Sequence, residues 1–527
     1  MTETSAPSTV NGAQSLIRTL VACGVDTCFT NPGTSEMHFV AALDTVPAMR
    51  AVLGLFEGVV TGAADGYARM AGRPAATLLH LGPGLGNGLA NLHNARKGHV
   101  PVVNIVGDHA TYHKQYDAQL ESDIETVARN VSAWIRRSEA TAAVGRDAAE
   151  AVAAALGPPG QVATLILPAD VSWSPGGTVA EPALATADAN PDADVVDAVA
   201  KALRSGEPAG LLLGGTALRE PGLLAASRVA NATGARLLAE TFPTRLERGA
   251  GLPPIDRLAY LAEFASAQLD GLRHLVVVDA KAPVSFFAYP GRDSYLVPAG
   301  CEVHLLAAPG GDATGALEAL AELVGAPPDA ASRQAAGRPD LPTGALTAEA
   351  VARALGALLP EGAIVSDEGN TSSLFAPGLT AGAPRHDWLT LTGGAIGQGM
   401  PVATGAAVAS PGRQVINLEA DGSSLYTIQS LWTQAREGLD VLTILFNNRS
   451  YAVLNMELNR VGAEAGPRAK DLLDLSRPDV DFVAVSQGLG VPASRATTAD
   501  ELSDQLARAL AAPGPALIEA VVPSITA

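Results

Sequence analysis

Residues 417–424 (NLEADGSS) and, further along the chain, residues 447–451 (NNRSY) decide the fold class. The run 414–418 is short and leans apolar, which predicts a strand before the first stretch. After that stretch apolar residues recur at helical spacing, and residues 440–446 (DVLTILF) are typical of a second buried strand. The pattern predicts a strand, an acidic turn, a helix and a second strand, which together form a parallel βαβ unit.

Asp421 and Asn448 follow these two strands and are therefore predicted to lie side by side. The carboxyl ends of parallel strands meet at one edge of the sheet, where open α/β sheets bind ligands. Carboxylate and amide oxygens suit Mg²⁺ or Ca²⁺, and Mg²⁺ usually completes its coordination with phosphate oxygens. Gly422 permits close approach of the backbone, and a helix opening at Ser423 would offer free N–H groups to an anion. The features predict a site for a metal-bound diphosphate; an ordinary Asp-Gly turn is the alternative.

Length and composition narrow the class of protein. The chain has 527 residues, which suggests roughly three domains, and 47% of them are hydrophobic. The net charge of −19 argues against binding to nucleic acid or to an anionic membrane surface. The three cysteines, Cys23, Cys28 and Cys301, form neither a disulfide framework nor a paired metal motif, which favours the reducing cytoplasm. No signal peptide and no apolar run of membrane-spanning length is expected.

Two segments rich in Ala, Pro and Asp or Gly divide the chain, and we interpret residues 176–192 and 325–345 as linkers. They separate three predicted domains, at residues 1–178, 190–325 and 345–527. Strand-like and helical segments alternate in each of them. The predicted fold class is therefore α/β, with three doubly wound parallel-sheet domains.

The motif at residues 420–423, followed by Asn447 and Asn448, resembles the thiamine-diphosphate motif of the superfamily of acetohydroxyacid synthase, benzoylformate decarboxylase and pyruvate decarboxylase. One residue departs from that motif, because Ala420 stands where the family has its first glycine. The resemblance covers most of the chain and is strongest to the acetolactate synthase large-subunit-like branch. It implies a pyrimidine-binding first domain, a middle domain and a third domain that binds the diphosphate and Mg²⁺.

The resemblance also implies which residues hold the cofactor. Mg²⁺ would be bound by Asp421, Asn448 and the main-chain carbonyl of Ser450. Ile396 falls near the place where a bulky aliphatic residue keeps the cofactor in its bent form. The full set of implied cofactor contacts is Glu57, Asn370, Thr371, Gly394, Ile396, Gly422, Ser423 and Tyr451.

Glu57 directly follows a predicted strand, residues 50–56, and precedes a helix. A glutamate in that position usually complements the helix dipole. Residues 54–58 (GLFEG) and 64–69 (ADGYAR), however, resemble the activating-glutamate motif of the superfamily. The implied role is a carboxyl group in an apolar pocket that hydrogen-bonds the aminopyrimidine ring of the cofactor. In the family this glutamate serves the cofactor of a neighbouring subunit, which implies a homodimer or homotetramer.

Two loops resemble substrate-binding loops of benzoylformate decarboxylase. In residues 80–87 (HLGPGLGN) the resemblance implies that His80 meets the substrate, although a lone histidine at a strand end is more often structural. In residues 31–34 (NPGT), Thr34 replaces the serine that contacts the substrate carboxylate in the family. A turn-capping role for this threonine is the alternative.

Benzoylformate decarboxylase has a second catalytic histidine, and residues 281–286 (KAPVSF) resemble the segment before it. Here the segment continues with Phe287, Ala288 and Tyr289 instead of a histidine. Whether His109 or His113 replaces the missing histidine stays open at this stage.

The predicted function is thiamine-diphosphate- and Mg²⁺-dependent decarboxylation of a 2-oxo acid with carboligation, as in acetolactate synthase. The main alternative is a decarboxylase of the benzoylformate type that does not ligate. A non-catalytic cofactor-binding protein and a nicotinamide-dependent enzyme are weaker alternatives, since Glu57 is retained and residues 82–87 lack a clean GxGxxG. The substrate is a small molecule; which 2-oxo acid it is, and whether FAD occupies the middle domain, are left open.

Overall fold

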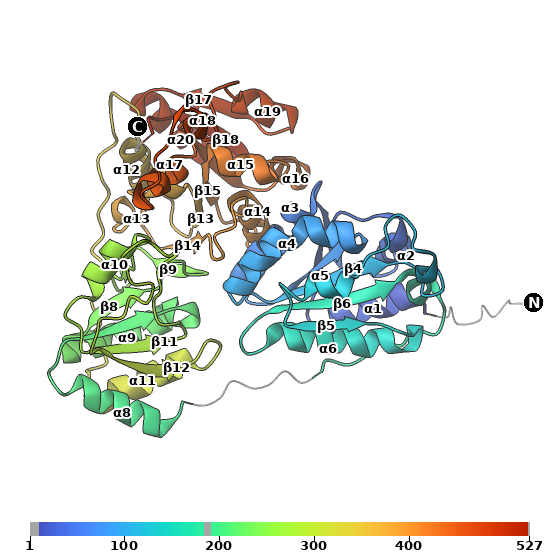
Figure 1. The fold of residues 1–527 in the computed structure, drawn as a ribbon, viewed down its shortest axis with the longest axis horizontal. Coiled ribbons are helices and arrows are strands. Elements are labelled where there is room, and N and C mark those ends of the chain that lie inside the picture. Colours follow the sequence, from blue (N-terminus) through green and yellow to red (C-terminus); the bar gives the residue numbers. More distant parts are fainter. Residues whose placement is uncertain (1–9, 184–190, 525–527) are drawn as a thin grey trace, which may run out of the picture. The chain divides into compact units, whose positions relative to one another are not determined.

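A computed structural model describes residues 10–183 and 191–524 and contains three α/β sheets (Figure 1). Neighbouring strands are parallel throughout the first two sheets and in all but one pair of the third. The predicted fold class, three parallel-sheet α/β domains, is confirmed. Residues 184–190, part of the predicted linker 176–192, lie outside the described residues, and the second predicted linker falls between α11 and α12.

The first sheet has the strand order β2-β1-β3-β4-β6-β5. Its strands are β1 (Thr27–Thr30), β2 (Arg50–Leu53), β3 (Ala75–Leu79), β4 (Val102–Asp108), β5 (Trp134–Arg137) and β6 (Val162–Pro168). Its helices are α1 (Gly12–Ala22), α2 (Met37–Leu43), α3 (Glu57–Ala71), α4 (Leu81–Lys97), α5 (Ile124–Ala128), α6 (Val144–Leu156) and α7 (Ala169–Trp173). The prediction that the second strand continues to Phe56 is wrong, because β2 ends at Leu53 and the chain turns before α3.

The middle sheet has the order β10-β8-β7-β11-β12, so that β12 is an edge strand. Its strands are β7 (Ala209–Leu213), β8 (Arg236–Ala239), β10 (Asp256–Arg257), β11 (His274–Val278) and β12 (Glu302–Ala307). Its helices are α8 (Ala193–Leu203), α9 (Glu220–Thr233), α10 (Ala262–Leu269) and α11 (Ala313–Leu323). Apolar side chains on successive positions of β7 and β11 enter two different cores, which is why both strands read as continuous apolar runs.

The third sheet has the order β17-β18-β16-β15-β13-β14-β9. Its strands are β9 (Leu246–Arg248), β13 (Ile364–Glu368), β14 (His386–Thr390), β15 (Val415–Ala420), β16 (Val441–Asn447), β17 (Ala493–Ala496) and β18 (Ala516–Val521). The helices that follow the linker 325–345 are α12 (Ala348–Leu358), α13 (Ala376–Leu379), α14 (Gly399–Ala409), α15 (Asp421–Thr427), α16 (Ser430–Glu437), α17 (Ala452–Arg460), α18 (Pro467–Asp471), α19 (Phe482–Gly488) and α20 (Ala499–Ala511). Strand β9 comes from the predicted middle segment and pairs antiparallel with β14.

The predicted βαβ unit is present, but its helix differs in two ways. It begins at Asp421 rather than Ser423, because the Ser424 hydroxyl donates to the Asp421 carbonyl at 2.7 Å and closes the acidic turn into the helix. It is also divided into α15 and α16. At the division the Thr427 hydroxyl donates to the Gly397 carbonyl at 3.0 Å, which anchors the chain at that point.

The chain forms two compact units, and each is described by itself. One unit contains residues 10–183 together with Gly393–Pro411 and Thr427–Leu439, and thus α14 and α16. The other contains residues 191–392 with Gly412–Tyr426 and Asp440 onward. Within residues 10–183 and 191–524, no helix is both long and apolar enough to cross a membrane.

In the first unit, α3 packs closely on α14 through glycines. A Cβ added at Gly66 would lie 2.1 Å from the carbonyl oxygen of Val402, and one at Gly405 would lie 1.8 Å from that of Ala63. Both distances are too short for any side chain. The small residues therefore allow the two helix backbones to approach each other.

We expect Gly66→Ala to lower the stability of the protein by about 1–3 kcal/mol, the usual cost of overpacking. This cost exceeds the roughly 1 kcal/mol that alanine gains over glycine in a helix interior. The matched control is Gly86→Ala in α4, where an added Cβ meets nothing within 4 Å and stability is expected to stay or rise. Thermal unfolding followed by circular dichroism distinguishes the two variants, and equal melting temperatures would contradict the close packing at Gly66.

Candidate active site

The carboxyl ends of β15 and β16 place Asp421 and Asn448 side by side, as the sequence predicts. The two strands pair in register as far as Ala420 and Phe446. Asp421 Oδ2 accepts hydrogen bonds from the backbone N–H groups of Asn448 at 3.0 Å and Arg449 at 2.6 Å. The turn after β16 is thereby tied to the first residue of α15.

The Asp421 carboxylate is a buried group whose hydrogen bonds come from the backbone. It is 3% exposed, and its Oδ1 accepts the N–H of Gly422 at 2.8 Å. Burial raises the pKa of Asp421 to about 6. Arg449 directs its guanidinium away, to Asp479 at 2.9 Å. A divalent cation would supply the countercharge that a buried carboxylate needs.

Asn448 and Ser450 add oxygen atoms to the same turn. Asn448 Oδ1 accepts the backbone N–H of Ser450 at 2.9 Å, and its amide nitrogen donates to Ser372 at 3.3 Å. These bonds hold the turn in one conformation. A carboxylate, an amide oxygen and a main-chain carbonyl are the hard donors that Mg²⁺ prefers, so this donor set fits the ion. Its role as a metal site stays a prediction.

The other predicted cofactor contacts of this unit follow the ends of β13, β15 and β16 and lie close together. Asn370, which follows β13, donates from its amide to the Ser423 hydroxyl at 3.0 Å. The ring of Tyr451 covers Gly422 so closely that an added Cβ would lie 2.4 Å from it. Thr371 lies in the same 3₁₀ turn as Asn370 and is partly buried. Polar donors from β13 and β15 thus adjoin the proposed metal ligands.

Glu57 is the first residue of α3 in the other unit. Its side chain is 7% exposed, and it accepts amide hydrogen bonds from Asn87 at 2.9 Å and Asn31 at 3.4 Å. Both donors are neutral amides, which form hydrogen bonds but no salt bridge with the carboxyl group. The carboxyl group is thus held at the beginning of α3 by neutral amide donors.

His80 precedes α4 and forms a pair with Glu36, a residue to which the sequence analysis assigns no role. Its Nδ1 lies 2.9 Å from Glu36 Oε2 and 3.2 Å from the Ser35 hydroxyl. Glu36 is only 2% exposed and also accepts the N–H of Gly33 at 2.8 Å. Thr34 is exposed, so that the hydroxyl next to His80 is that of Ser35. In the sequence, the role of Glu36 is indicated only by its position three residues after Gly33 in a predicted tight turn.

Two asparagines of α4, also without an assigned role in the sequence analysis, position the loop that contains Gly394 and Ile396. The Asn91 amide donates both to the Gly58 carbonyl at 2.8 Å and to the Gly397 carbonyl at 3.1 Å. Asn94 donates to the Ala395 carbonyl at 2.8 Å. The beginning of α3, with Glu57, is therefore connected to the loop at residues 393–398, where Ile396 is partly buried. In the sequence, this positioning role is indicated only by two asparagines three residues apart on one predicted helix.

The sequence lacks a histidine at the position of benzoylformate decarboxylase's second catalytic histidine. His109 and His113, which could replace it, lie in one unit, and the segment where it would be expected lies in the other. His109 and His113 lie with their ring centroids 5.2 Å apart in the first unit. In the other unit Tyr289 donates from its hydroxyl to Glu457 at 2.9 Å, and the guanidinium of Arg460 lies over its ring. Tyr289, two residues after Phe287, thus belongs to a polar network with Glu457 and Arg460.

At the carboxyl end of β11 in the middle sheet, one carboxylate binds two turns. Asp279 follows β11, and its Oδ2 accepts both the N–H and the hydroxyl of Thr216, at 2.7 and 2.9 Å. Its Oδ1 accepts the N–H of Gly310 at 2.9 Å. A carboxylate therefore uses the turn N–H groups that would otherwise be available to a dinucleotide phosphate. These two backbone N–H groups are therefore already satisfied within the protein.

Comparison with known proteins gives consistent matches along the chain. Residues 10–128 match the family described as thiamine pyrophosphate enzyme, N-terminal TPP binding domain, and residues 367–520 match the corresponding C-terminal TPP binding domain. A Mycobacterium tuberculosis protein named "Putative acetolactate synthase large subunit IlvX" is 63% identical over 98% of this chain and 100% of its own length. Benzoylformate decarboxylase of Pseudomonas aeruginosa is 32% identical over 94% of this chain and 96% of its own. The structure of thiamine diphosphate-dependent 4-hydroxybenzoylformate decarboxylase from Rhodococcus jostii RHA1 superposes with a TM-score of 0.85 at 25% identity, covering 98% of this chain and all of the other.

Proposed function

Because the chain belongs to the thiamine pyrophosphate enzymes, we propose that it decarboxylates a 2-oxo acid with thiamine diphosphate and Mg²⁺ and joins the product to a second carbonyl compound, as an acetolactate synthase does. The observation that carries this proposal is the meeting of Asp421 and Asn448 at the adjacent ends of β15 and β16. The name of the relative that shares 63% of its residues supports the ligating reaction.

Asp421, Asn448 and the Ser450 carbonyl would hold Mg²⁺, which in turn would hold the diphosphate. The diphosphate contacts would come from Asn370, Thr371, Gly422 and Ser423, with Tyr451 packed on Gly422. Gly394 and Ile396 are the further cofactor contacts that the family resemblance implies. When bound, thiamine diphosphate supplies an electron-accepting ring for the electron pair that is released as CO₂ leaves.

Glu57 would hydrogen-bond the aminopyrimidine ring and hold a proton on its carboxyl group. Its burial and the two neutral amide donors that hold the carboxyl group in place support this role. Asn91 would act as a positioning residue, because its amide connects the backbone after Glu57 to the backbone after Ile396.

His80 would face the substrate and act as a catalytic proton donor or acceptor. Because its Nδ1 is engaged by Glu36, the Nε2 atom is the ring nitrogen left to meet a substrate. The buried Glu36 would fix the orientation of the ring. Thr34, exposed at the same turn, would contact the substrate carboxylate with its hydroxyl.

A second candidate function is decarboxylation of an aromatic 2-oxo acid without ligation. It is favoured by four aromatic rings that pack together, Phe242, Tyr260, Phe286 and Phe287, with centroids of neighbouring rings 4.8 to 6.2 Å apart. The pairs are edge-to-face or tilted, and aromatic rings in such contacts can also pack against the ring of a ligand. The relatives named benzoylformate decarboxylase and 4-hydroxybenzoylformate decarboxylase agree with this alternative.

The remaining assignments are proposed on the same basis. The pyrimidine-binding, middle and diphosphate-binding domains would be residues 1–178, 190–325 and 345–527. The protein would be cytoplasmic, with a small-molecule substrate, and would form a homodimer or homotetramer whose active sites lie at the subunit interface.

Feeding a single 2-oxo acid to the protein, with thiamine diphosphate and Mg²⁺ added, tests these functions. We expect pyruvate to give mainly acetolactate, the product in which two pyruvate molecules are joined with loss of one CO₂. Release of CO₂ is expected to depend on the added cofactor. Benzoylformate is the matched substrate: benzaldehyde as the main product, without a ligated product from pyruvate, would favour the second candidate. Release of CO₂ from neither acid, nor from a wider panel of 2-oxo acids, would reject both. Mass spectrometry and gas chromatography identify the products.

A further inference from the structure

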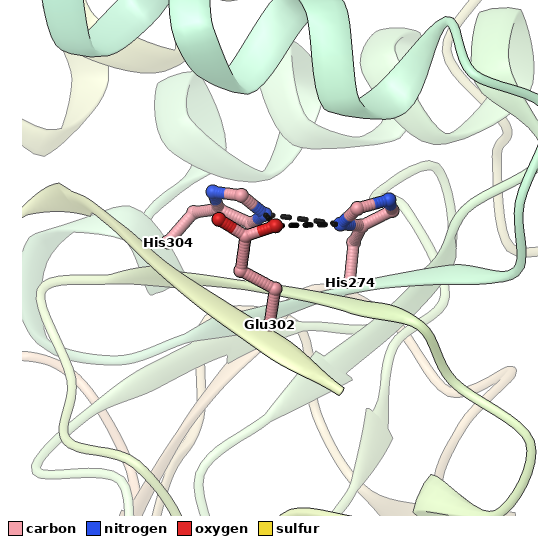
Figure 2. Close-up of side chains that lie close together, drawn as sticks. All are labelled: His274, Glu302 and His304. Carbon is pink, nitrogen blue, oxygen red and sulfur yellow. Dashed lines mark hydrogen bonds and ion pairs between the residues drawn. The ribbon is translucent and has the colours of Figure 1, made fainter. Parts of the chain in front are cut away.

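Three side chains that could bind a metal lie close together in the middle sheet. None of them is among the residues assigned to the cofactor. His274 lies at the start of β11, and Glu302 and His304 lie on the edge strand β12 (Figure 2). The strands pair in register with His274 opposite Glu302 and Val276 opposite His304. Because side chains alternate along a strand, Glu302 and His304 share one face with His274.

The distances between the ligand atoms suit a single small cation. His274 Nδ1 and His304 Nε2 are 3.1 Å apart, and each lies 3.9 Å from a carboxylate oxygen of Glu302. Metal–ligand bonds of about 2.0–2.1 Å in a tetrahedral zinc site place neighbouring ligand atoms roughly 3.3 Å apart. The side chain of Glu302 is 69% exposed and can move the last few tenths of an ångström without disturbing the core. Figure 2 shows the carboxylate beside the two rings.

A fourth residue prepares His274 to bind a metal. Its Nε2 lies 3.1 Å from the carboxylate of Glu207, which therefore accepts the Nε2 proton. The tautomer with a proton on Nε2 leaves a lone pair on Nδ1, the atom that faces His304 and Glu302. Histidines that bind metals usually donate their other ring N–H to a carboxylate in this manner.

From this geometry we propose that His274 Nδ1, His304 Nε2 and a Glu302 carboxylate oxygen form a binding site for Zn²⁺, with water as the fourth ligand. Two imidazoles and one carboxylate are a donor set that zinc accepts, whereas Mg²⁺ prefers oxygen ligands. The bound ion would cross-link β12, which has a strand partner on one side only, to β11. The ion would thus stabilise the edge of the sheet, and the site is independent of the proposed reaction.

The test uses the full-length protein, freed of zinc and then saturated with Mg²⁺ and thiamine diphosphate, so that the Asp421 site is already occupied. Titration with Co²⁺ is followed by the visible absorption of the tetrahedral ion, and Zn²⁺ is then added as competitor. We expect one Co²⁺ per chain, displaced by Zn²⁺. His304→Gln is expected to weaken binding at least about 100-fold, and Glu207→Gln by about 10–100-fold, the usual effect of removing the partner of a ligating histidine.

Two further variants keep the test decisive. Glu302→Gln alters an exposed residue, so it retains the fold even where a change at the buried His274 does not, and it should also weaken Zn²⁺ binding. Glu318→Gln in α11 removes the same charge from another exposed glutamate of the domain and should leave the affinity unchanged. Wild-type protein that binds no Co²⁺, or that binds it no better than His304→Gln and Glu302→Gln, would overturn the proposal.

Discussion

Asp421→Ala is expected to abolish the stabilisation that thiamine diphosphate and Mg²⁺ give to the protein. A ligand present at 100 times its Kd stabilises the folded state by about 2.7 kcal/mol, and this gain disappears when binding is lost. The reason is that alanine removes the buried carboxylate that accepts the N–H groups of Gly422, Asn448 and Arg449 and that would bind the ion. Differential scanning fluorimetry with the cofactor and Mg²⁺ together, and with each alone, measures the shift in Tm.

Asp479→Ala is the matched control for that experiment. Asp479 is an exposed carboxylate that binds the guanidinium of Arg449, the residue next to Asn448. Its loss should leave the cofactor-dependent shift in place, because it offers no ligand to the ion. A shift that persists unchanged in Asp421→Ala would remove Asp421 from the site and with it the main support for Mg²⁺-dependent binding.

Glu57→Gln is expected to lower turnover of a 2-oxo acid by about 10²–10⁴-fold, the range usual for a positioned acid–base group. Glutamine keeps the size of the side chain, but its amide can neither hold nor release the proton. Cofactor binding, read from the same Tm shift, should largely remain, since the metal ligands are untouched. The comparison is made on kcat for the 2-oxo acid that gives the highest turnover in the panel; equal turnover of both proteins would exclude Glu57 from the mechanism.

Mixing the two inactive variants tests whether Glu57 serves the cofactor of a neighbouring subunit. When Glu57→Gln and Asp421→Ala chains are unfolded and reassembled in equal amounts, half of the dimers contain one chain of each kind. If each site combines Glu57 of one chain with Asp421 of the other, one site of each mixed dimer is intact, and about one quarter of wild-type activity returns. No recovery, although mixed dimers form, would place both residues of a site on the same chain.

The parallel α/β architecture was predictable from the sequence because its signals are local. Buried parallel strands are apolar throughout, and the strands predicted at residues 414–418 and 440–446 are present as β15 (Val415–Ala420) and β16 (Val441–Asn447), with bounds that differ by one or two residues. The meeting of Asp421 and Asn448 followed as well, since two polar residues that each end a strand of one βαβ unit must lie at the same edge of the sheet. The cofactor family was recognisable for the same reason, as its motif lies on that unit.

Other features of the site depend on contacts between segments that are distant along the chain. His80 meets Glu36 only because β1 and β3 are neighbours, and Asn91 reaches Gly397 only because helix α4 packs beside the loop before α14. No local periodicity marks such partners, which is why the roles of Glu36 and Asn91 were missed. In the same way, His274 and His304 are unremarkable in the sequence, and the register of β11 and β12 alone sets their ring nitrogens 3.1 Å apart. Local hydrophobic pattern therefore determined the elements, whereas strand order and register, set by packing of the whole core, decided which side chains can act together.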